Sequence, residues 1–270
     1  DPVRMLNKCS FSWPASWWPN LYAINLTKGC EFNCSYCWAK DMSKRFPGMR
    51  PLSGEWSKPD LKYPVSWENT QQAAMLLRGL RDDIFPLNLK GKLVPKTILF
   101  SATCDPYQPI AQEATHAFLE TSLYLKSFPL YSHFSVLILT KSPDVVKDLN
   151  VLKDLHAEVG FTIDPGAPSS NAPVLKKRLD TLYFLQGFGI RTFISFEPWW
   201  PGVDIDALID IINEAWVSGD HRTRFIFGSL NKNGRPVNPD FYRRELPKLK
   251  AWLDAQGLVE EQGQGTGNYW

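Results

Sequence analysis

The chain has 270 residues, of which 44% are hydrophobic and 21% charged, and its formal net charge is +2. These values are close to the average for soluble globular proteins, so neither a disordered chain nor a membrane protein is indicated. No apolar run approaches the roughly 20 residues of a membrane-spanning helix, and the nearly balanced charge gives no evidence for a nucleic-acid partner.

Six short runs rich in apolar and β-branched residues are predicted to be strands. Several are apolar almost throughout, as expected for parallel strands that are covered on both faces. In chain order they are residues 21–27, 96–102, 133–140, 157–164, 191–197 and 223–230.

Amphipathic segments alternate with these runs and predict helices. The first opens on Ser66, a residue type that favours the N-cap, and Ser142–Pro143 and Asn238–Pro239 are typical of an N-cap followed by a first-turn proline. The predicted helices are residues 66–82, 110–125, 142–156, 172–189, 204–216 and 238–257.

The six strand–helix alternations predict a parallel α/β fold that is wound with one hand and forms one domain. We assign residues 21–257 to this domain, residues 1–20 to an N-terminal extension rich in tryptophan and proline, and residues 258–270 to a mobile C-terminal tail. Residues 46–65 lie outside the alternation, because they hold four prolines and show no clear period.

Three of the five cysteines, Cys30, Cys34 and Cys37, lie in one loop directly after the first predicted strand. Structural zinc normally takes four ligands, and the histidines of this chain are scattered singly. An iron–sulfur cluster usually takes four cysteines too. Three ligands therefore favour a [4Fe-4S] cluster with one iron open to a small molecule; a non-enzymatic zinc-binding module is the alternative. An odd, clustered set of cysteines also favours a reducing cytoplasm over a secreted disulfide framework.

The cysteine spacing, with the aromatic Tyr36 just before the last cysteine, resembles the signature of the radical S-adenosylmethionine (AdoMet) enzymes. In that family AdoMet binds the open iron, and the reduced cluster cleaves it to a 5′-deoxyadenosyl radical that abstracts a hydrogen atom. The family fold is a (βα)6 partial barrel of parallel strands, with the cluster in the loop after the first strand. The resemblance covers roughly residues 20–240. It implies a [4Fe-4S] cluster and AdoMet as cofactors and an external electron donor of the flavodoxin or ferredoxin type.

Polar residues end the predicted strands, at the barrel rim where active-site groups of parallel barrels lie. The segments "TCDPYQPI", "LTKSP" and "FTID" resemble the subgroup of spore photoproduct lyase and DNA-repair-photolyase-like proteins, and "WAKDMSKRF" and "SFEPWWPG" resemble an uncharacterised phage-associated family as well. The lyase resemblance implies that Lys141 approaches the AdoMet carboxylate and that Thr162 also binds this cofactor. The other predicted cofactor-binding residues are Tyr36, Ser101, Thr103, Asp105, Asp164, Ser195 and Glu197.

Some of these residues also fit a structural interpretation. Asp105 and Asp164 each precede a proline and could simply form turns. Glu197 ends an apolar strand, where an unpaired carboxylate is costly, so a bond to a ligand or ribose is favoured. Cys104 is a candidate hydrogen-atom donor, since the lyase is understood to use a cysteine, but free cysteine is often a small buried hydrophobe.

The substrate class stays open between a nucleic-acid base or lesion and a small metabolite or peptide. Trp199 and Trp200 follow Glu197 on the rim, where flat side chains could stack on a base. Trp13, Trp17 and Trp18 could line a substrate cleft or, as we favour, cap the open barrel with apolar surface. Basic residues dispersed along the chain, Arg178 and Arg224 among them, are expected on solvated faces. The sequence indicates no membrane association and no particular oligomeric state.

Overall fold

The structure is a computed structural model that describes residues 6–9, 18–63, 70–88, 96–167, 170–217, 223–229, 231–232 and 235–256. The predicted tail at 258–270, Trp13, Trp17 and the predicted N-cap Ser66 lie outside these ranges. None of the described helices is long and apolar enough to cross a membrane.

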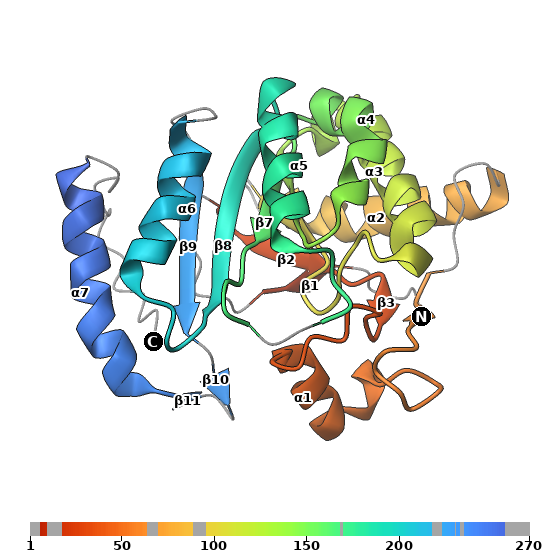
Figure 1. The fold of residues 1–270 in the computed structure, drawn as a ribbon. Helices are drawn as coiled ribbons and strands as arrows, with labels where there is room; N and C mark the ends of the chain where they lie inside the picture. The colour runs from red at the N-terminus through yellow and green to blue at the C-terminus, as the bar shows by residue number, and fades with distance from the viewer. Residues whose placement is uncertain are drawn as a thin grey trace.

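A central sheet of seven strands has the order β1-β2-β5-β6-β7-β8-β9 (Figure 1). Neighbours from β2 to β9 pair in parallel, whereas β1, which is not among the predicted strands, pairs antiparallel with β2 at one edge. The strands are β1 (Asn7–Lys8), β2 (Leu21–Ile24), β5 (Lys96–Phe100), β6 (Phe134–Thr140), β7 (Glu158–Thr162), β8 (Arg191–Trp199) and β9 (Arg224–Ser229). The six predicted strands and the parallel α/β partial-barrel fold are therefore confirmed.

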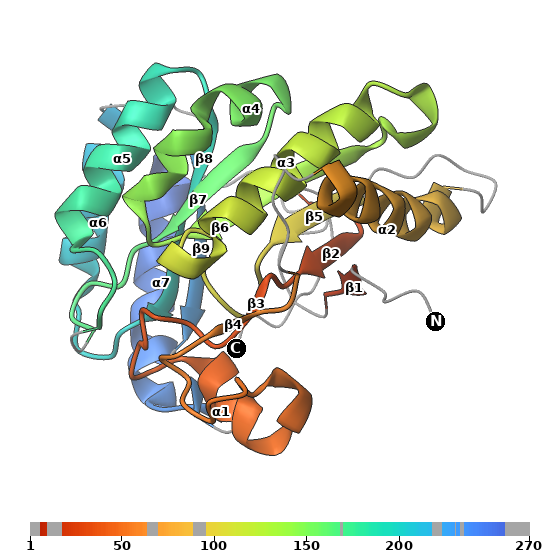
Figure 2. The ribbon, with the colours of Figure 1, turned by 90° about the vertical axis from the view of Figure 1, so that its right-hand side faces the viewer.

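Helices connect each parallel strand to the next, and α2 to α6 follow one another along one face of the sheet (Figure 2). Ser142 Oγ accepts a hydrogen bond from Asp144 N at 3.2 Å and Asn238 Oδ1 accepts one from Phe241 N at 3.1 Å, so both predicted N-caps are present. The elements are α2 (Thr70–Asn88), α3 (Gln112–Lys126), the 3-10 helix η4 (Pro143–Asp148) with α4 (Leu149–Asp154), α5 (Leu175–Gly187), α6 (Ile205–Val217) and α7 (Pro239–Ala255).

Alternate residues along the strands enter two separate apolar groups, as the period of two in a strand requires. One group lies between the sheet and the helices, where Ile138 and Phe161 of the strands meet Phe118 and Leu182 of the helices. The other group lies on the inner face of the barrel and contains Trp18, Leu21, Leu99, Leu137, Phe193 and Ile226.

Gly160 of β7 leaves room for the ring of Phe193 on the inner face. The two residues are register partners on neighbouring strands. A Cβ atom at position 160 would lie 2.1 Å from the nearest ring carbon of Phe193, which is closer than van der Waals contact permits. The same ring packs against the Trp18 indole, with centroids 5.0 Å apart.

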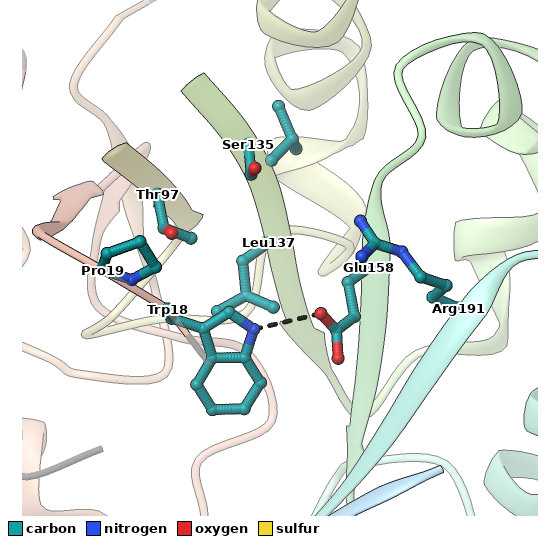
Figure 3. Close-up of a pocket in the computed structure, with 8 residues that line it drawn as sticks. Trp18, Pro19, Thr97, Ser135, Leu137, Glu158 and Arg191 are labelled. Atoms are coloured by element: carbon teal, nitrogen blue, oxygen red, sulfur yellow. Dashed lines mark hydrogen bonds between the residues drawn. The ribbon is translucent and has the colours of Figure 1, made fainter. Parts of the chain in front are cut away.

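Trp18 closes the inner face at the amino ends of the strands (Figure 3). Its Nε1 donates to Glu158 Oε2 at 3.1 Å, and Arg224 Nη1 donates to the same buried carboxylate oxygen at 3.2 Å. Arg224, expected on a solvated face, is therefore partly exposed and pairs with a buried carboxylate. Trp18 packs on the inner face, whereas the favoured role of the N-terminal tryptophans was to cap the open side of the barrel. The small hollow beside Trp18 lies at the opposite end of the strands from the cysteine loop.

Candidate active site

The three clustered cysteines lie in a loop that follows β3 (Thr27–Lys28) and ends where α1 (Trp38–Arg45) begins. Cys30 and Cys34 are buried, at 8% exposure each, and Cys37 is partly buried at the N-cap of α1. They belong to one apolar group that also contains Phe32 and Trp56. Burial raises the pKa of the Cys30 thiol well above its ordinary value. A metal binds the thiolate form of cysteine, so metal ligation releases the proton that such a thiol otherwise keeps.

Gln108 fastens this loop to the barrel. Its side chain is fully buried; Oε1 accepts from Glu31 N at 2.8 Å, and Nε2 donates to Thr27 Oγ1 at 2.9 Å. In return the Glu31 carboxylate accepts from Ile110 N at 3.2 Å. The sequence motif around Gln108 was assigned to the cofactor site without a role for this residue. Its hydrogen bonds give it one, which is to hold the cysteine loop.

Residues 46–63, the described part of the aperiodic segment, pack against the cysteine loop. Strand β4 (Asp60–Leu61) pairs with β3, and Cys30 N donates to Trp56 O at 2.8 Å. Gly29, with φ of +88°, permits this approach, because a Cβ there would lie 2.6 Å from Trp56 O and 2.7 Å from Pro51 Cγ. This part of the segment therefore supports the cysteine loop.

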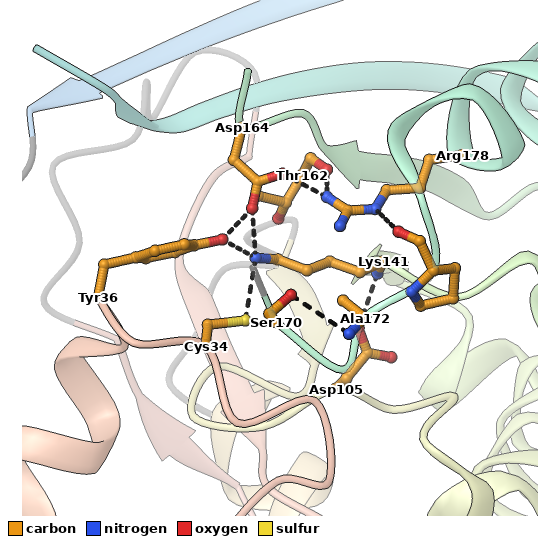
Figure 4. A network of polar contacts seen from close by, with 10 residues as sticks. Cys34, Tyr36, Asp105, Lys141, Thr162, Asp164, Ser170, Ala172 and Arg178 are labelled. Atoms are coloured by element: carbon orange, nitrogen blue, oxygen red, sulfur yellow. Dashed lines mark hydrogen bonds and ion pairs between the residues drawn. The ribbon is translucent and has the colours of Figure 1, made fainter. Parts of the chain in front are cut away.

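Lys141, at the end of β6, reaches the cysteine loop (Figure 4). Its Nζ lies 3.4 Å from Cys34 Sγ and 2.8 Å from Asp164 Oδ2, and it donates to the Tyr36 hydroxyl, which donates in turn to Asp164. Burial and the Asp164 carboxylate raise the pKa of Tyr36, so the hydroxyl keeps its proton. The structure thus brings together four residues predicted from sequence: Cys34, Tyr36, Lys141 and Asp164. Because the Asp164 side chain pairs with Lys141 and Tyr36, its role is not limited to forming a turn.

Arg178 on α5 completes this network, although its position in a basic run predicted a solvated residue. That expectation is wrong, since Arg178 is 4% exposed. Its Nη1 lies 2.5 Å from Asp164 Oδ1 and 2.9 Å from the Thr162 carbonyl oxygen, and its Nε donates to Pro173 O at 2.8 Å. Burial alone would raise the pKa of Asp164, but the charges of Lys141 and Arg178 outweigh it and hold the pKa below its ordinary value.

Asp105 lies beneath the network and organises the backbone at the ends of β5 and β6. Its carboxylate accepts from Thr140 Oγ1 at 2.7 Å, Lys141 N at 2.7 Å and Tyr107 N at 2.9 Å. Complete burial raises its pKa in spite of these donors. These contacts make Asp105 a positioning residue for Lys141.

The remaining predicted rim residues occupy neighbouring strand ends. Ser195 is register partner of Thr162, and its Oγ donates to Glu197 Oε2 at 2.7 Å. Gly228 of β9 leaves space for Glu197, since a Cβ there would lie 2.7 Å from Glu197 Cγ. On the other side of the barrel, Ser101 Oγ accepts from Leu26 N at 3.4 Å, and Thr103 N donates to Asn25 Oδ1 at 3.0 Å.

Cys104 is partly exposed and packs against the apolar group of the cysteine loop. Its role as a hydrogen-atom donor stays a prediction.

The two rim tryptophans differ in exposure. Trp199 is fully buried, donates from Nε1 to Val203 O at 3.0 Å and cannot stack on a substrate base. Trp200 is partly exposed and packs edge-on against Tyr36, with centroids 6.0 Å apart.

Two kinds of metal centre can be considered for the cysteine loop. Among the described residues, no three Cys, His, Asp or Glu side chains are arranged to hold one metal ion. A structural zinc ion normally takes four ligands around one point, whereas a [4Fe-4S] cluster takes its cysteines at separate irons. Three cysteines on one partly buried loop, next to the partly buried Lys141, fit the cysteine set of such a cluster.

Comparisons with known proteins give two uncharacterized relatives, and no protein-family model matches the chain. A protein of Methanocaldococcus jannaschii is 29% identical over 201 residues, which are 70% of this chain and 64% of that protein. A protein of Acidianus two-tailed virus is 27% identical over 188 residues, which are 67% of this chain and 56% of that protein. The chain thus spans less than two thirds of the length of either relative.

Solved structures of spore photoproduct lyase share the fold. A mutant lyase with bound AdoMet and dinucleoside spore photoproduct matches with a TM-score of 0.58 at 15% identity, over 90% of this chain and 65% of that one. The lyase complexed with dinucleoside spore photoproduct gives a TM-score of 0.53 at 14% identity, over 83% of this chain and 59% of that one. The predicted resemblance to the lyase is therefore confirmed at the level of the fold.

Proposed function

We propose that this chain is a radical AdoMet enzyme in which Cys30, Cys34 and Cys37 hold a [4Fe-4S] cluster. The observation that carries the proposal is the position of Lys141, whose ammonium group lies 3.4 Å from Cys34 Sγ. A cation buried beside the cysteine loop suits the carboxylate of AdoMet bound at an open iron. When bound and reduced, the cluster supplies an electron to the AdoMet sulfonium, and an external flavodoxin or ferredoxin type protein is the proposed source of that electron.

The protein side chains bind and orient the cofactor. In the structure, Tyr36 and Asp164 hold the ammonium group of Lys141 beside the cysteine loop. Lys141 turns from Asp164 to pair with the AdoMet carboxylate. Glu197, held by Ser195, accepts hydrogen bonds from the ribose hydroxyl groups. The other proposed contacts to AdoMet come from rim residues Ser101, Thr103 and Thr162. Asp105, predicted to bind the cofactor, acts through Lys141, whose backbone N–H donates to the Asp105 carboxylate.

For the substrate we propose a nucleic-acid base or lesion of the kind bound by spore photoproduct lyase. The shared fold supports this choice, because the matched lyase structures hold dinucleoside spore photoproduct. Trp200 supports it as well, since a partly exposed indole next to Tyr36 offers a stacking surface at the rim. Cys104 is the proposed hydrogen-atom donor to the substrate radical. All five cysteines are free thiols, which persist best in a reducing cytoplasm.

The test is anaerobic reconstitution followed by reduction with dithionite in the presence of AdoMet. We expect about four irons per chain, as a [4Fe-4S] cluster requires, and release of 5′-deoxyadenosine and methionine. Cys34→Ala should abolish both, whereas Cys9→Ala, outside the loop, should retain them. Iron-free protein, or product release unchanged by Cys34→Ala, would contradict the proposal.

The substrate is tested separately with dinucleoside spore photoproduct. We expect its conversion to depend on AdoMet and to change its product distribution in Cys104→Ala while AdoMet cleavage continues. AdoMet cleavage without any conversion would retain the enzyme class and favour a small metabolite or peptide instead.

A further inference from the structure

Trp56 has a buried polar group without a partner, and it packs beside the cysteines of the loop. The residue is 7% exposed and packs in the same apolar group as Cys30 and Cys34. Its indole Nε1 is buried, and no described residue accepts its hydrogen. Most buried polar groups in proteins have a hydrogen-bond partner, so an orphaned donor calls for an explanation.

The backbone of Trp56 is held against the cysteine loop. The Trp56 carbonyl oxygen accepts from Cys30 N at 2.8 Å. Gly29, which has φ of +88°, lies so close that a Cβ atom would be 2.6 Å from that oxygen and 3.2 Å from Pro59 Cα. These contacts place the Trp56 backbone beside the cysteines, and the indole packs in the same apolar group.

The other members of the apolar group supply no suitable acceptor. Phe32 and Ala39 have apolar side chains, and neutral thiols are only weak acceptors. Sulfur that carries negative charge is a much better acceptor, because hydrogen bonds to ionised groups are roughly twice as strong as neutral ones. The apolar group around the cysteines therefore contains a buried donor that anionic sulfur would satisfy.

We propose that the Trp56 indole N–H donates a hydrogen bond to a sulfur of the cluster held by Cys30, Cys34 and Cys37. This inference rests on the proposed function. Trp56 is then a tuning residue, because hydrogen bonds to the sulfurs are among the factors that set the reduction potential of an iron–sulfur cluster. The bond stabilises the reduced, more negative cluster and raises the potential.

The test is a potentiometric titration of Trp56→Phe, which keeps an aromatic ring and removes the N–H. We expect full iron and sulfide content but a lower potential, with the equilibrium constant for one-electron reduction reduced by up to about tenfold, or about 59 mV. Trp252→Phe, on α7 and away from the cysteines, is the matched control and should leave the potential unchanged. Equal potentials for Trp56→Phe and the unchanged protein would overturn the inference.

A second measurement does not depend on the folding of that variant. Protein labelled with ¹⁵N in its indole rings is reduced and examined by electron–nuclear double resonance. We expect a hyperfine coupling from one indole nitrogen and another from its solvent-exchangeable hydrogen. Trp38→Phe, which removes the half-exposed indole next to Cys37, is the control, and both couplings should persist in it. A loaded, reduced cluster without such coupling overturns this inference alone, whereas protein that binds no iron overturns the proposed function with it.

Discussion

Replacement of Arg178 by methionine tests how the buried charges control AdoMet binding. In the structure Asp164 is shared between two cations, with Lys141 at 2.8 Å and Arg178 at 2.5 Å. When Lys141 turns to the AdoMet carboxylate, Arg178 still compensates the Asp164 charge. In Arg178→Met, the same movement would leave a buried carboxylate unpaired.

The cost of that movement can be approximated from the geometry. Two unit charges about 4 Å apart attract by about 4 kcal/mol at an effective dielectric constant of about 20. If only a third of this attraction opposes ligand binding, AdoMet affinity falls by about tenfold, since about 1.4 kcal/mol is a factor of ten. The variant also loses about 1.5–3 kcal/mol of stability, because the Thr162 and Pro173 carbonyl oxygens lose their charged donor while Lys141 still pairs with Asp164.

The assay is anaerobic isothermal titration of AdoMet into cluster-loaded protein, for a double-mutant cycle of Arg178→Met and Asp164→Asn. We expect weak binding by Arg178→Met and recovery toward the original affinity in the double variant, because Lys141 is then released from Asp164. Arg178→Lys, which keeps the charge, should bind nearly normally. A double variant that binds more weakly than Arg178→Met would refute this reasoning and indicate a purely structural role.

Three further predictions concern the scaffold. Gly160→Ala should lower the free energy of unfolding by about 3 kcal/mol or more in chemical denaturation, because the new methyl group overlaps the Phe193 ring. Gly187→Ala has open space around it and should not be destabilising. Equal free energies of unfolding for the two variants would contradict the packing of Phe193 against Gly160. Gln108→Ala should lose iron to a chelator about 10- to 100-fold faster, as expected when a residue that supports metal ligands is removed; unchanged loss would show that the loop needs no such clamp. Trp18→Phe should cost about 1–2 kcal/mol of stability and leave AdoMet affinity unchanged, and a loss of affinity would contradict its place at the far end of the barrel.

The sequence predicted those parts of the molecule that local pattern determines. The parallel strands are continuous apolar runs because both of their faces are covered. Lys141 and Asp164 follow such runs, at the rim where the carboxyl ends of parallel strands meet. The cofactor-binding role of Lys141 is what the resemblance of its segment to the lyase implies. The structure places both residues in one network with the cysteine loop.

Arg178 was missed because it follows Lys176 and Lys177 in a basic run. Its helical position carried a usable signal, since it lies three residues after Leu175 and four before Leu182 on the apolar stripe of α5. A charged residue on such a stripe needs a buried partner. Here that partner is Asp164, which comes from another element.

Other features depend on contacts that no local pattern encodes. Trp199 and Trp200 are adjacent in sequence, yet Trp199 is fully buried and Trp200 partly exposed, because successive residues of an extended chain point to opposite faces. Residues 46–63 show no period, since their structure comes from pairing with β3 and from contact of Trp56 with the cysteine loop. The role of this segment therefore became visible only in three dimensions.

The most direct test of the account is electron paramagnetic resonance of the dithionite-reduced protein before and after addition of AdoMet labelled with ¹⁷O in its carboxylate. We predict a reduced four-iron signal that changes on addition and gains a hyperfine coupling from the label, which Lys141→Met should weaken through lower occupancy. A spectrum that AdoMet leaves unchanged at saturating concentration would contradict the claim that three cysteines leave one iron open to this cofactor.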